Sequence, residues 1–282
     1  MILIQLMGGL GNQLFMIFAT VSYAIDYNIE YGFISNNNNT VHGPSQYWDN
    51  LLKCFQKNVN TQCNDYQNIY KESCYKYECL PHHLSLGNSL IESSYLQSYK
   101  YFAHNYDKII EKMELRQQQA DTRNKYNTVF QTKTIAMHFR FGDYLKYKEH
   151  HCITPAMYFI KAIKELSQDL DNRGEKIENY KILCFCEPGN DTYVTEFLNK
   201  INEEVPSRMD FVRISDEIPD WTQLLMMSCC DHFIITNSSF SWFGAYFSEN
   251  TEKIVYRPKE WFGPVLKSHD ITDLCPTEWK II

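Results

Sequence analysis

The sequence predicts an α/β protein whose C-terminal half is a doubly wound parallel sheet. Between residues 134 and 256, short apolar runs alternate with amphipathic stretches of helical spacing. The chain also begins with an apolar run, a glycine-rich turn and a helical pattern, which is the same β–α order. A polar stretch at 117–127 separates the two regions. We therefore expect an N-terminal domain over residues 1–126 and a C-terminal domain over residues 127–282.

The composition limits the partners that the chain can have. Its 27 Lys or Arg and 34 Asp or Glu give a net charge of −7, and no block is rich in Lys or Arg. This argues against nucleic acid as the main partner but allows a local basic pocket for a diphosphate. The first seven residues lack a positively charged region, and no run reaches about 18 apolar residues. We therefore expect no signal peptide, no membrane-spanning segment and a cytoplasmic protein.

The cysteines are expected to be reduced thiols. There are ten, and without an export signal they are more typical of a cytosolic protein than of a disulfide framework. Cys74, Cys79, His82 and His83 cluster, but their spacing is not a standard zinc spacing and has no second half.

The N-terminus has the form of an anion-binding turn. Residues 2–6 predict a strand, the glycine-rich turn follows, and Asn12 is expected to be the N-cap of a helix. With Gly9 and Gly11 followed by Leu14, the third glycine of the dinucleotide fingerprint is missing, and no Gly-Lys-Ser/Thr of a P-loop follows. The alternative is a tight β–α turn that binds no ligand.

The rest of the N-terminal half has a weaker pattern. Residues 35–50 are expected to form a polar loop, and residues 51–90 show no clear periodicity. Residues 91–102 predict a strand that ends near Gln97 and turns into a short helix. An amphipathic helix is expected from 106 to about 125.

The C-terminal half is more regular. Five strands are expected, at 134–139, 180–186, 210–214, 232–236 and 253–256. Helices are expected after Thr154 as N-cap with Pro155 at the first helical position, after Asn190 over 191–203, from Pro219 to Cys229, and after Trp242 to about residue 248. In such sheets, ligands bind outside the carboxyl ends of the strands.

Three polar side chains follow the first of these strands. His138 and Arg140 share one face of the strand, while Phe139 and Phe141 share the other, because successive side chains alternate. The guanidinium of Arg140 matches phosphate oxygens, so we expect an anion site here. The alternative is that Arg140 and Asp143 form a pair that ties a loop to the strand.

Two further strand ends carry polar residues. Thr-Asn-Ser-Ser-Phe-Ser at 236–241 lies where a strand meets a helix, so hydroxyls and free N–H groups there can ligate a phosphate. One of these Ser is expected to be only the N-cap of that helix, which leaves the others unexplained. Glu187 follows another strand end.

Four blocks then resemble one family. They are Gly-Gly-Leu-Gly-Asn-Gln-Leu-Phe at 8–15, Tyr-Leu-Gln-Ser-Tyr-Lys-Tyr-Phe at 95–102, His-Phe-Arg-Phe-Gly-Asp-Tyr at 138–144, and Leu-Met-Met-Ser-Cys-Cys at 225–230 with 236–245. In this order, across nearly the whole chain, they are similar to the motifs of the α1,2-fucosyltransferases, glycosyltransferase family 11. The chain departs from that family at two places. Phe141 stands where a second Arg is usual. Cys186-Glu187-Pro188 stands where family members end the strand in Ser-Asp-Asp-Pro, so one acidic residue remains and the spacing is shorter.

The resemblance implies a fold and a reaction. The fold would be GT-B-like, with two Rossmann-like halves and a cleft between them, the acceptor side in residues 1–126 and the GDP-sugar site in residues 127–282. The enzyme would be inverting and would move L-fucose from GDP-β-L-fucose to a hydroxyl of a galactose-type glycan, in α1,2 linkage. A D-x-D motif after a strand is missing, so we expect neither a metal nor a cofactor.

The resemblance also implies roles for single residues. Arg140 would hold the β-phosphate, and His138 would contact the guanosine end. Glu187 would meet guanine N–H groups. The remaining donor-binding residues would be Ser238, Ser239 and the Phe240 backbone, together with Asn12, Gly9 and Gly11 from the other domain.

Roles on the acceptor side follow in the same way. If the acceptor hydroxyl needs a base, Asp143 is the first candidate and His138 the second, although a salt bridge of Asp143 to Arg140 explains it equally well. Gln97 and Tyr144 are expected to contact the acceptor, and Tyr144 could instead only pack its loop.

Three other functions stay open. A transferase for another GDP-sugar, such as GDP-rhamnose, would share the same site. A relative that binds GDP or a glycan without activity is allowed by the two departures. An NAD- or FAD-dependent oxidoreductase rests only on the turn at Gly9–Gly11.

Overall fold

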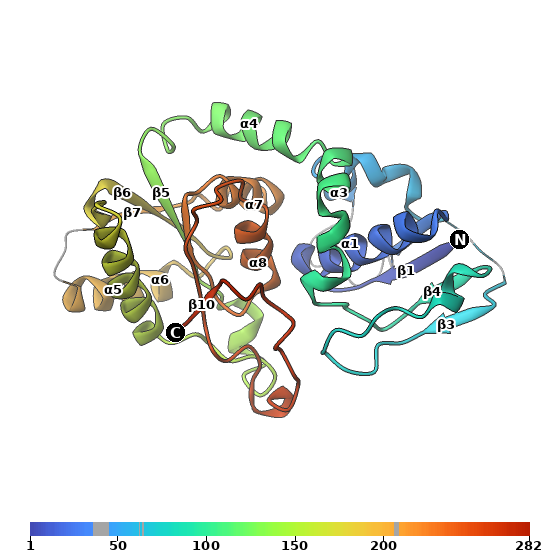
Figure 1. Ribbon diagram of the computed structural model, residues 1–282. Helices are drawn as coiled ribbons and strands as arrows, with labels where there is room; N and C mark the ends of the chain where they lie inside the picture. Colours follow the sequence, from blue (N-terminus) through green and yellow to red (C-terminus); the bar gives the residue numbers. More distant parts are fainter. Residues whose placement is uncertain (36–44, 62, 64, 206–208) are drawn as a thin grey trace. The chain divides into compact units, whose positions relative to one another are not determined.

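A computed structural model of the chain describes residues 1–35, 45–61, 63, 65–205 and 209–282 (Figure 1). Contacts divide it into two compact units, the first of Met1–Gln118 with His269–Pro276 and the second of Gln119–Ser268 with Thr277–Ile282. This division falls earlier in the chain than the boundary proposed after residue 126, and it returns residues 269–276 to the first unit.

The first unit contains a four-stranded parallel sheet in the order β2-β1-β4-β3. Its strands are β1 (Ile2–Leu6), β2 (Tyr31–Ser35), β3 (Asn68–Tyr70) and β4 (Ser89–Ile91). The strand predicted from residue 91 to near Gln97 is wrong, because β4 ends at Ile91 and the backbone of Ser93 and Leu96 is left-handed, with φ of 51° and 52°. The short helix predicted after it is present as a 3-10 helix at Tyr99–Tyr101. The strands β3 and β4 have three residues each, which is too short to show a period of two.

The helix after β1 begins earlier than predicted. Helix α1 (Leu10–Tyr27) has Gly9 as its N-cap, with φ −75° and ψ 178°, so Asn12 lies inside the first turn and the predicted Asn12 cap is wrong. Helix α2 (Ser45–Trp48) lies within the predicted loop 35–50, of which residues 36–44 are outside the described residues. Short 3-10 helices follow at Lys53–Asn58, His82–Ser85, Tyr99–Tyr101 and Ala103–Asn105.

The predicted helix at 106–125 is two helices. They are α3 (Tyr106–Lys112) and α4 (Leu115–Lys125), and they are separated at Glu114, whose φ is 52°. A non-glycine residue in the left-handed region ends an α-helix, so the apolar period continues while the axis changes.

The second unit contains a six-stranded, wholly parallel sheet in the order β10-β9-β8-β5-β6-β7. The strands are β5 (Lys133–His138), β6 (Tyr180–Phe185), β7 (Asp210–Arg213), β8 (His232–Ile234), β9 (Val255–Arg257) and β10 (Lys280–Ile281). The doubly wound parallel sheet predicted here is confirmed. Strand β10 was not predicted, because two residues carry no periodicity.

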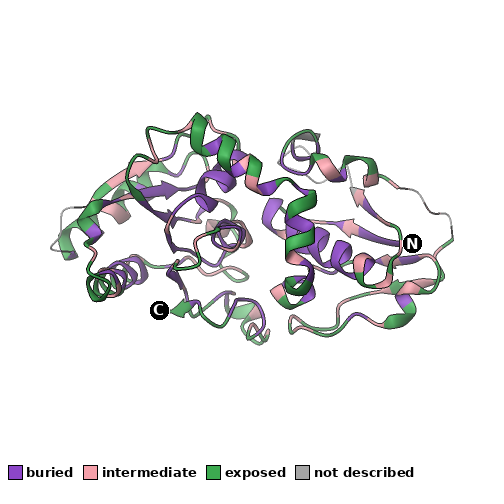
Figure 2. Ribbon diagram, turned by 45° about the horizontal axis from the view of Figure 1, so that its top comes forward, coloured by how far each residue is buried: buried purple, intermediate pink, exposed green. Residues whose placement is uncertain are grey.

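Helices cover both faces of this sheet (Figure 1). On one face lie α5 (Ala156–Asn172) and α6 (Asp191–Glu204), and on the other α7 (Asp220–Ser228) and α8 (Ser239–Tyr246). Ile135 and Met137 of β5 belong to a core cluster with α5 and α6. Figure 2 shows that the central strands are largely buried, as are β1 in the first sheet and β5, β6 and β8 in the second. Alternate residues of β5 therefore belong to opposite sides of the sheet.

Two predicted helix caps behave differently. The N-cap of α5 is Pro155, not Thr154, since the helix begins at Ala156 and the Thr154 hydroxyl donates to Asn237 Oδ1 at 3.1 Å. Asn190 is the N-cap of α6 as predicted, but its side-chain amide donates to the backbone oxygen of Glu187. Both side chains thus fasten loops at the carboxyl edge of the sheet.

Two further features bear on the expected environment. All ten cysteines are free thiols. Among the described residues, none of the helices is both long and apolar enough to cross a membrane.

Candidate functional site

The order of the strands brings four polar strand ends together at one edge of the second sheet. His138 ends β5, and β5 lies between β6, which leads to Glu187, and β8, which leads to Thr236. Arg213 ends β7, the next strand beyond β6. Because parallel strands end at the same edge, residues that are far apart in the sequence become neighbours.

His138 is a buried, neutral imidazole. Its side chain is 4% exposed, its Nδ1 lies 3.0 Å from the Thr236 hydroxyl oxygen, and its ring lies 5.6 Å from that of Phe240. Burial, together with the nearby charge of Arg140, lowers the pKa of His138 to about 3. The ring can therefore make directed hydrogen bonds at neutral pH but carries no charge.

Arg140 is held between two carboxylates. Its guanidinium forms an ion pair with Glu187 and another with Asp143, where Nη2 lies 2.5 Å from Oδ1. Burial acts to lower the pKa of Arg140, but Glu187, Tyr144 and Asp143 outweigh it and raise that pKa. The Arg140–Asp143 pair that the sequence allowed as an alternative is present. It does not remove the cation from solvent, since the side chain is 26% exposed.

The glycine after Phe141 adopts a backbone conformation that other residues rarely adopt. The Phe141 N–H donates to Glu187 Oε2 at 3.3 Å, while Gly142 adopts φ +29°, where a Cβ atom would lie 3.5 Å from Glu187 Cδ. The Phe141 ring turns to the opposite side, 3% exposed, where it packs on Phe197 and Tyr193. Phe139 and Phe141 both belong to the core cluster, so they share one face as predicted, opposite His138 and Arg140.

Tyr144 supports Arg140 and is itself held in place. The Arg140 guanidinium lies 4.9 Å from the centre of the Tyr144 ring, and His151 stacks on that ring at 4.2 Å. The Tyr144 hydroxyl donates to the Asn237 backbone oxygen at 2.9 Å, and burial raises the pKa of Tyr144 to about 12. Packing within the loop, which the sequence allowed for Tyr144, is thus present.

Asn237 links this loop to the strand end. Its amide nitrogen donates to the backbone oxygens of Cys152 and Trp261, each at 2.9 Å, and its amide oxygen accepts from Thr154. With a side chain only 1% exposed, Asn237 is a structural residue within a polar motif.

The turn after β8 presents a helix N-terminus. Ser238 is the N-cap of α8, its side chain makes no cap hydrogen bond, and it is 5% exposed. Ser239 and Phe240, which form the first turn, are half-buried. The N-terminus of an α-helix attracts anions, which agrees with the chemistry expected for Ser238, Ser239 and Phe240.

Arg213 was not recognised in the sequence. It forms ion pairs with Asp216 at 2.5 Å and with Asp191 at 3.3 Å, and its Nη2 donates to the Cys186 backbone oxygen at 3.4 Å. It therefore ties the end of β7 to the turn that carries Glu187. The available signal was a cation as the last residue of a predicted strand.

A second polar turn lies in the first unit, between β1 and α1. Gly8 adopts φ +70°, and its backbone oxygen accepts a hydrogen bond from the Gln13 amide at 2.9 Å. The Gln97 amide donates to Asn12 Oδ1 at 2.8 Å. Gly9 is exposed and Gly11 is buried. The structure thus brings together Asn12 and Gln97, two residues that the resemblance implied for donor and acceptor.

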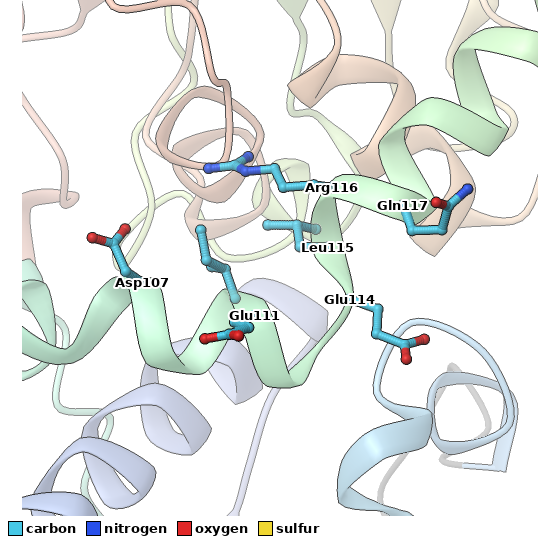
Figure 3. A pocket seen from close by; sticks show the side chains of 7 residues that line it. Asp107, Glu111, Glu114, Leu115, Arg116 and Gln117 are labelled. Atoms are coloured by element: carbon cyan, nitrogen blue, oxygen red, sulfur yellow. The ribbon is translucent and has the colours of Figure 1, made fainter.

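Figure 3 shows a pocket elsewhere in the first unit. Its volume is about 700 Å³. The lining belongs to α3, the bend after it and the start of α4, and consists of Asp107, Ile110, Glu111, Glu114, Leu115, Arg116 and Gln117. None of the predicted site residues is in this lining. Within the described part of the chain, no group of three or more His, Cys, Asp or Glu side chains is arranged so that it could hold a metal ion.

Comparison with known families decides the identity. The sequence pattern of Glycosyl transferase family 11 matches residues 1–262. The chain belongs to glycosyl transferase family 11. The resemblance seen in the four motifs is therefore confirmed, and this family 11 chain is a glycosyltransferase of the α1,2-fucosyltransferase family.

Two relatives from Escherichia coli agree with this assignment. An alpha-1,2-colitosyltransferase is 24% identical over 299 residues, which cover 98% of this chain and 96% of the relative. The O-antigen biosynthesis glycosyltransferase WbnK is 31% identical over 138 residues, which cover 48% of this chain and 41% of that protein.

Solved structures confirm the predicted GT-B-like fold of this family 11 enzyme. The ADP-heptose lipopolysaccharide heptosyltransferase II of E. coli has a TM-score of 0.51 and 10% identity, over 100% of this chain and 89% of that chain. FUT1 of Arabidopsis thaliana, solved as a mutant in complex with GDP, has a TM-score of 0.50 and 12% identity, over 99% of this chain and 75% of that chain.

Proposed function

We propose that this enzyme transfers L-fucose from GDP-β-L-fucose to a hydroxyl of a galactose-type glycan acceptor. The reaction would invert the anomeric centre, form an α1,2 linkage and need no metal. The observation that carries this proposal is Arg140, a guanidinium held at the carboxyl edge of a parallel sheet between Glu187 and Asp143. Membership of family 11 supplies the reaction class.

The charge of the transition state explains the need for Arg140. When the bond between the sugar and the diphosphate breaks, negative charge builds up on the leaving phosphate. Fixed donors that are already oriented stabilise such charge without reorganisation. In our proposal, Arg140 and the N-terminus of α8, with Ser238 and Ser239, are these donors.

In this proposal, the diphosphate of the substrate displaces the two carboxylates from the Arg140 guanidinium. A diphosphate competes with Glu187 and Asp143 for the guanidinium, because phosphate and carboxylate both suit its planar fork. Glu187, once released, can accept hydrogen bonds from the neighbouring N–H groups of guanine. Uracil and cytosine do not offer that pair of donors, so this exchange favours GDP over UDP or CDP.

Among the two candidates for the base, the structure favours Asp143. His138 is 4% exposed and its pKa is about 3, so it is a weak proton acceptor that binds through directed hydrogen bonds. The Asp143 side chain is 52% exposed and borders Arg140. We therefore propose that Asp143 accepts the proton of the acceptor hydroxyl and that His138 contacts the guanosine end.

A second donor is favoured by one observation. The relative that matches almost the whole chain is an alpha-1,2-colitosyltransferase, and colitose is L-fucose without its 3-hydroxyl group. The proposed charge-binding residues do not contact the sugar, so they suit GDP-colitose, GDP-rhamnose and GDP-fucose equally. Transfer rates with these three donors, measured on one acceptor, identify the sugar, and GDP-fucose is the expected best donor.

The nucleotide is tested by thermal unfolding with GDP, UDP and CDP. A ligand at 100 times its Kd stabilises the native state by about 2.7 kcal/mol, and we expect this only with GDP. The Glu187→Gln variant should lose much of the preference for GDP, whereas Glu196→Gln on the exposed face of α6 should retain it. Equal shifts with all three nucleotides would contradict the proposal. A shift with GDP but neither transfer nor slow donor hydrolysis would identify an inactive relative.

A further inference from the structure

The segment between β4 and the 3-10 helix at Tyr99–Tyr101 has an unusual backbone. Ser93 and Leu96 are both left-handed, with φ of 51° and 52°. This conformation is unfavourable for residues other than glycine. Surrounding contacts must therefore hold the segment in this shape.

Glu72 makes those contacts. It follows β3, and its Oε2 accepts hydrogen bonds from the backbone N–H groups of Tyr95 at 3.1 Å and Leu96 at 3.3 Å. Its own N–H donates to the Ser94 hydroxyl at 2.7 Å, and that hydroxyl donates to the Glu92 backbone oxygen. Hydrogen bonds to a charged group are stronger than those between neutral groups. The Glu72 side chain thus stabilises the turn at Tyr95 and Leu96, and the Glu72 backbone N–H adds a contact to Ser94.

The second carboxylate oxygen limits what Glu72 can do. Oε1 is covered from solvent and has no hydrogen-bond partner among the described residues. Burial raises the pKa of this carboxyl group, although the two N–H donors act in the opposite direction. A covered oxygen does not meet an acceptor hydroxyl, so Glu72 acts on the site through other residues.

The residue through which it acts is Gln97. Gln97 follows Leu96 directly and donates to Asn12 Oδ1 at 2.8 Å. On the far side of Gln97, the Ser98 hydroxyl donates to the Asp273 backbone oxygen at 2.5 Å, and Lys100 forms an ion pair with the Asp273 side chain. Gln97 is thus fixed by contacts on both sides of it in the chain. The contacts before it, which Glu72 makes, hold the left-handed turn.

We propose that Glu72 is a positioning residue for transfer, which holds the segment 93–97 so that Gln97 orients Asn12 in the first turn of α1. The role of Asn12 and Gln97 toward the sugars rests on the proposed function. The geometry of Glu72, the turn and Gln97 does not, so the two can be tested separately.

The test compares the full-length wild type with Glu72→Ala, Glu72→Gln and the matched control Glu78→Ala. Glu78 is an exposed carboxylate of the same stretch, bonded to the Ser73 hydroxyl at 2.8 Å. Three quantities are measured: hydrogen exchange of the amides in 93–98, the Kd for GDP, and kcat/KM with GDP-fucose and methyl β-galactoside.

We expect Glu72→Ala to speed the exchange of the Tyr95 and Leu96 amides by about tenfold or more and to lower kcat/KM by about tenfold, because charge-assisted hydrogen bonds are lost. The Kd for GDP should stay within about twofold, since the proposed GDP contacts Arg140 and Glu187 belong to the second unit. Glu72→Gln keeps an oxygen for both N–H groups and should return exchange and kcat/KM to within about threefold of wild type.

Three results would overturn the proposal. They are unchanged exchange in Glu72→Ala, a loss of GDP affinity as large as the loss of kcat/KM, or an equal effect of Glu78→Ala. If the wild type transfers no fucose, the proposed function fails. The exchange of 93–98 and the recovery by Glu72→Gln then decide the role of Glu72 by themselves.

Discussion

The polar sites at the strand ends of the two units have opposite characters. The one in the second unit is charged: Arg140 faces Glu187 and Asp143, and Arg213 faces Asp191 and Asp216. The one in the first unit is neutral and is built from the Gly8 backbone and the amides of Asn12, Gln13 and Gln97. Both follow β-strands of parallel sheets, so the fold provides the position and the side chains provide the chemistry.

This difference supports a division of roles between the units. A diphosphate needs cations and helix N-termini, which the second unit has. A sugar hydroxyl is both donor and acceptor, so neutral amides and backbone groups match it without attracting counterions. We therefore propose that the second unit binds the nucleotide and that the first binds sugar hydroxyls. The following predictions test each side, starting with the largest expected effect.

Removing the cation should have the largest effect on the charged side. We expect Arg140→Ala to lower kcat by about 100- to 1000-fold, like the loss of one oriented donor to a developing anion. The control is Lys146→Ala, which removes an exposed cation from the same loop and should leave kcat almost unchanged. Near-normal transfer by Arg140→Ala would show that charge at this strand end is not part of the reaction.

The apolar support of the same strand end is tested by Phe141→Ala. This ring is 3% exposed and packs on Phe197 and Tyr193, so its removal should lower the free energy of unfolding by about 3 kcal/mol. Tyr193→Ala, which removes a ring that is 42% exposed, should cost about 1 kcal/mol. Denaturant unfolding measures both, and equal losses would mean that Phe141 is not a core residue.

On the neutral side, Gly8→Ala should be more harmful than Gly9→Ala. Gly8 has φ +70°, and an added Cβ would lie 2.5 Å from Asn12 Nδ2, so we expect a loss of about 2 kcal/mol in stability and a lower transfer rate. Gly9 has φ −75° and no atom within 4 Å of an added Cβ. Its substitution should change stability by less than about 0.5 kcal/mol. Comparable effects of the two substitutions would show that the backbone of this turn is not constrained.

The buried histidines predict a gradual effect of pH. His138 has a pKa of about 3 and His232 of about 4 in the folded chain, both lowered first of all by burial. Below a pH of about 6.5 the unfolded chain binds these protons and the folded chain does not, so stability falls as the pH falls. The slope is at most about 1.4 kcal/mol per pH unit for each histidine.

Denaturant unfolding between pH 7 and pH 4 measures that slope. The two histidines should contribute about equally to the slope of the unfolding free energy against pH. His138→Gln should therefore remove about half of their contribution, and His232→Gln should remove the other half. An unchanged slope in His138→Gln would mean that His138 is accessible to protons in the folded chain.

The regular half of the fold was predictable, and the irregular half was not. Strands β5 and β6 have six residues each with buried apolar side chains, which is long enough to show a pattern. Strands β3 and β4 have three residues, and the left-handed turns at Ser93, Leu96 and Glu114 occur without glycine, so local propensity does not reveal them. The errors in the strand at 91–97 and in the helix at 106–125 both result from such turns.

Within the candidate site, the sequence by itself determined which chemical groups lie at each strand end. His138, Arg140 and Asp143 are close in the chain, and their alternation follows from the period of a strand. The family followed from four motifs in order, and comparison confirmed it. The roles of the individual residues stay predictions.

Only the tertiary structure decided which partners these groups have. Arg140 pairs with Glu187, Tyr144 bonds to Asn237, and Glu72 bonds to Leu96. The residues of each pair lie far apart in the sequence, and only the order of the strands in the sheets brings them together. The physical reason is that ion pairs and hydrogen bonds act over about 3 Å, whereas sequence patterns report only on neighbours along the chain. At both the charged and the neutral strand ends, the sequence thus determines which residues are present, and the fold determines which contacts they make.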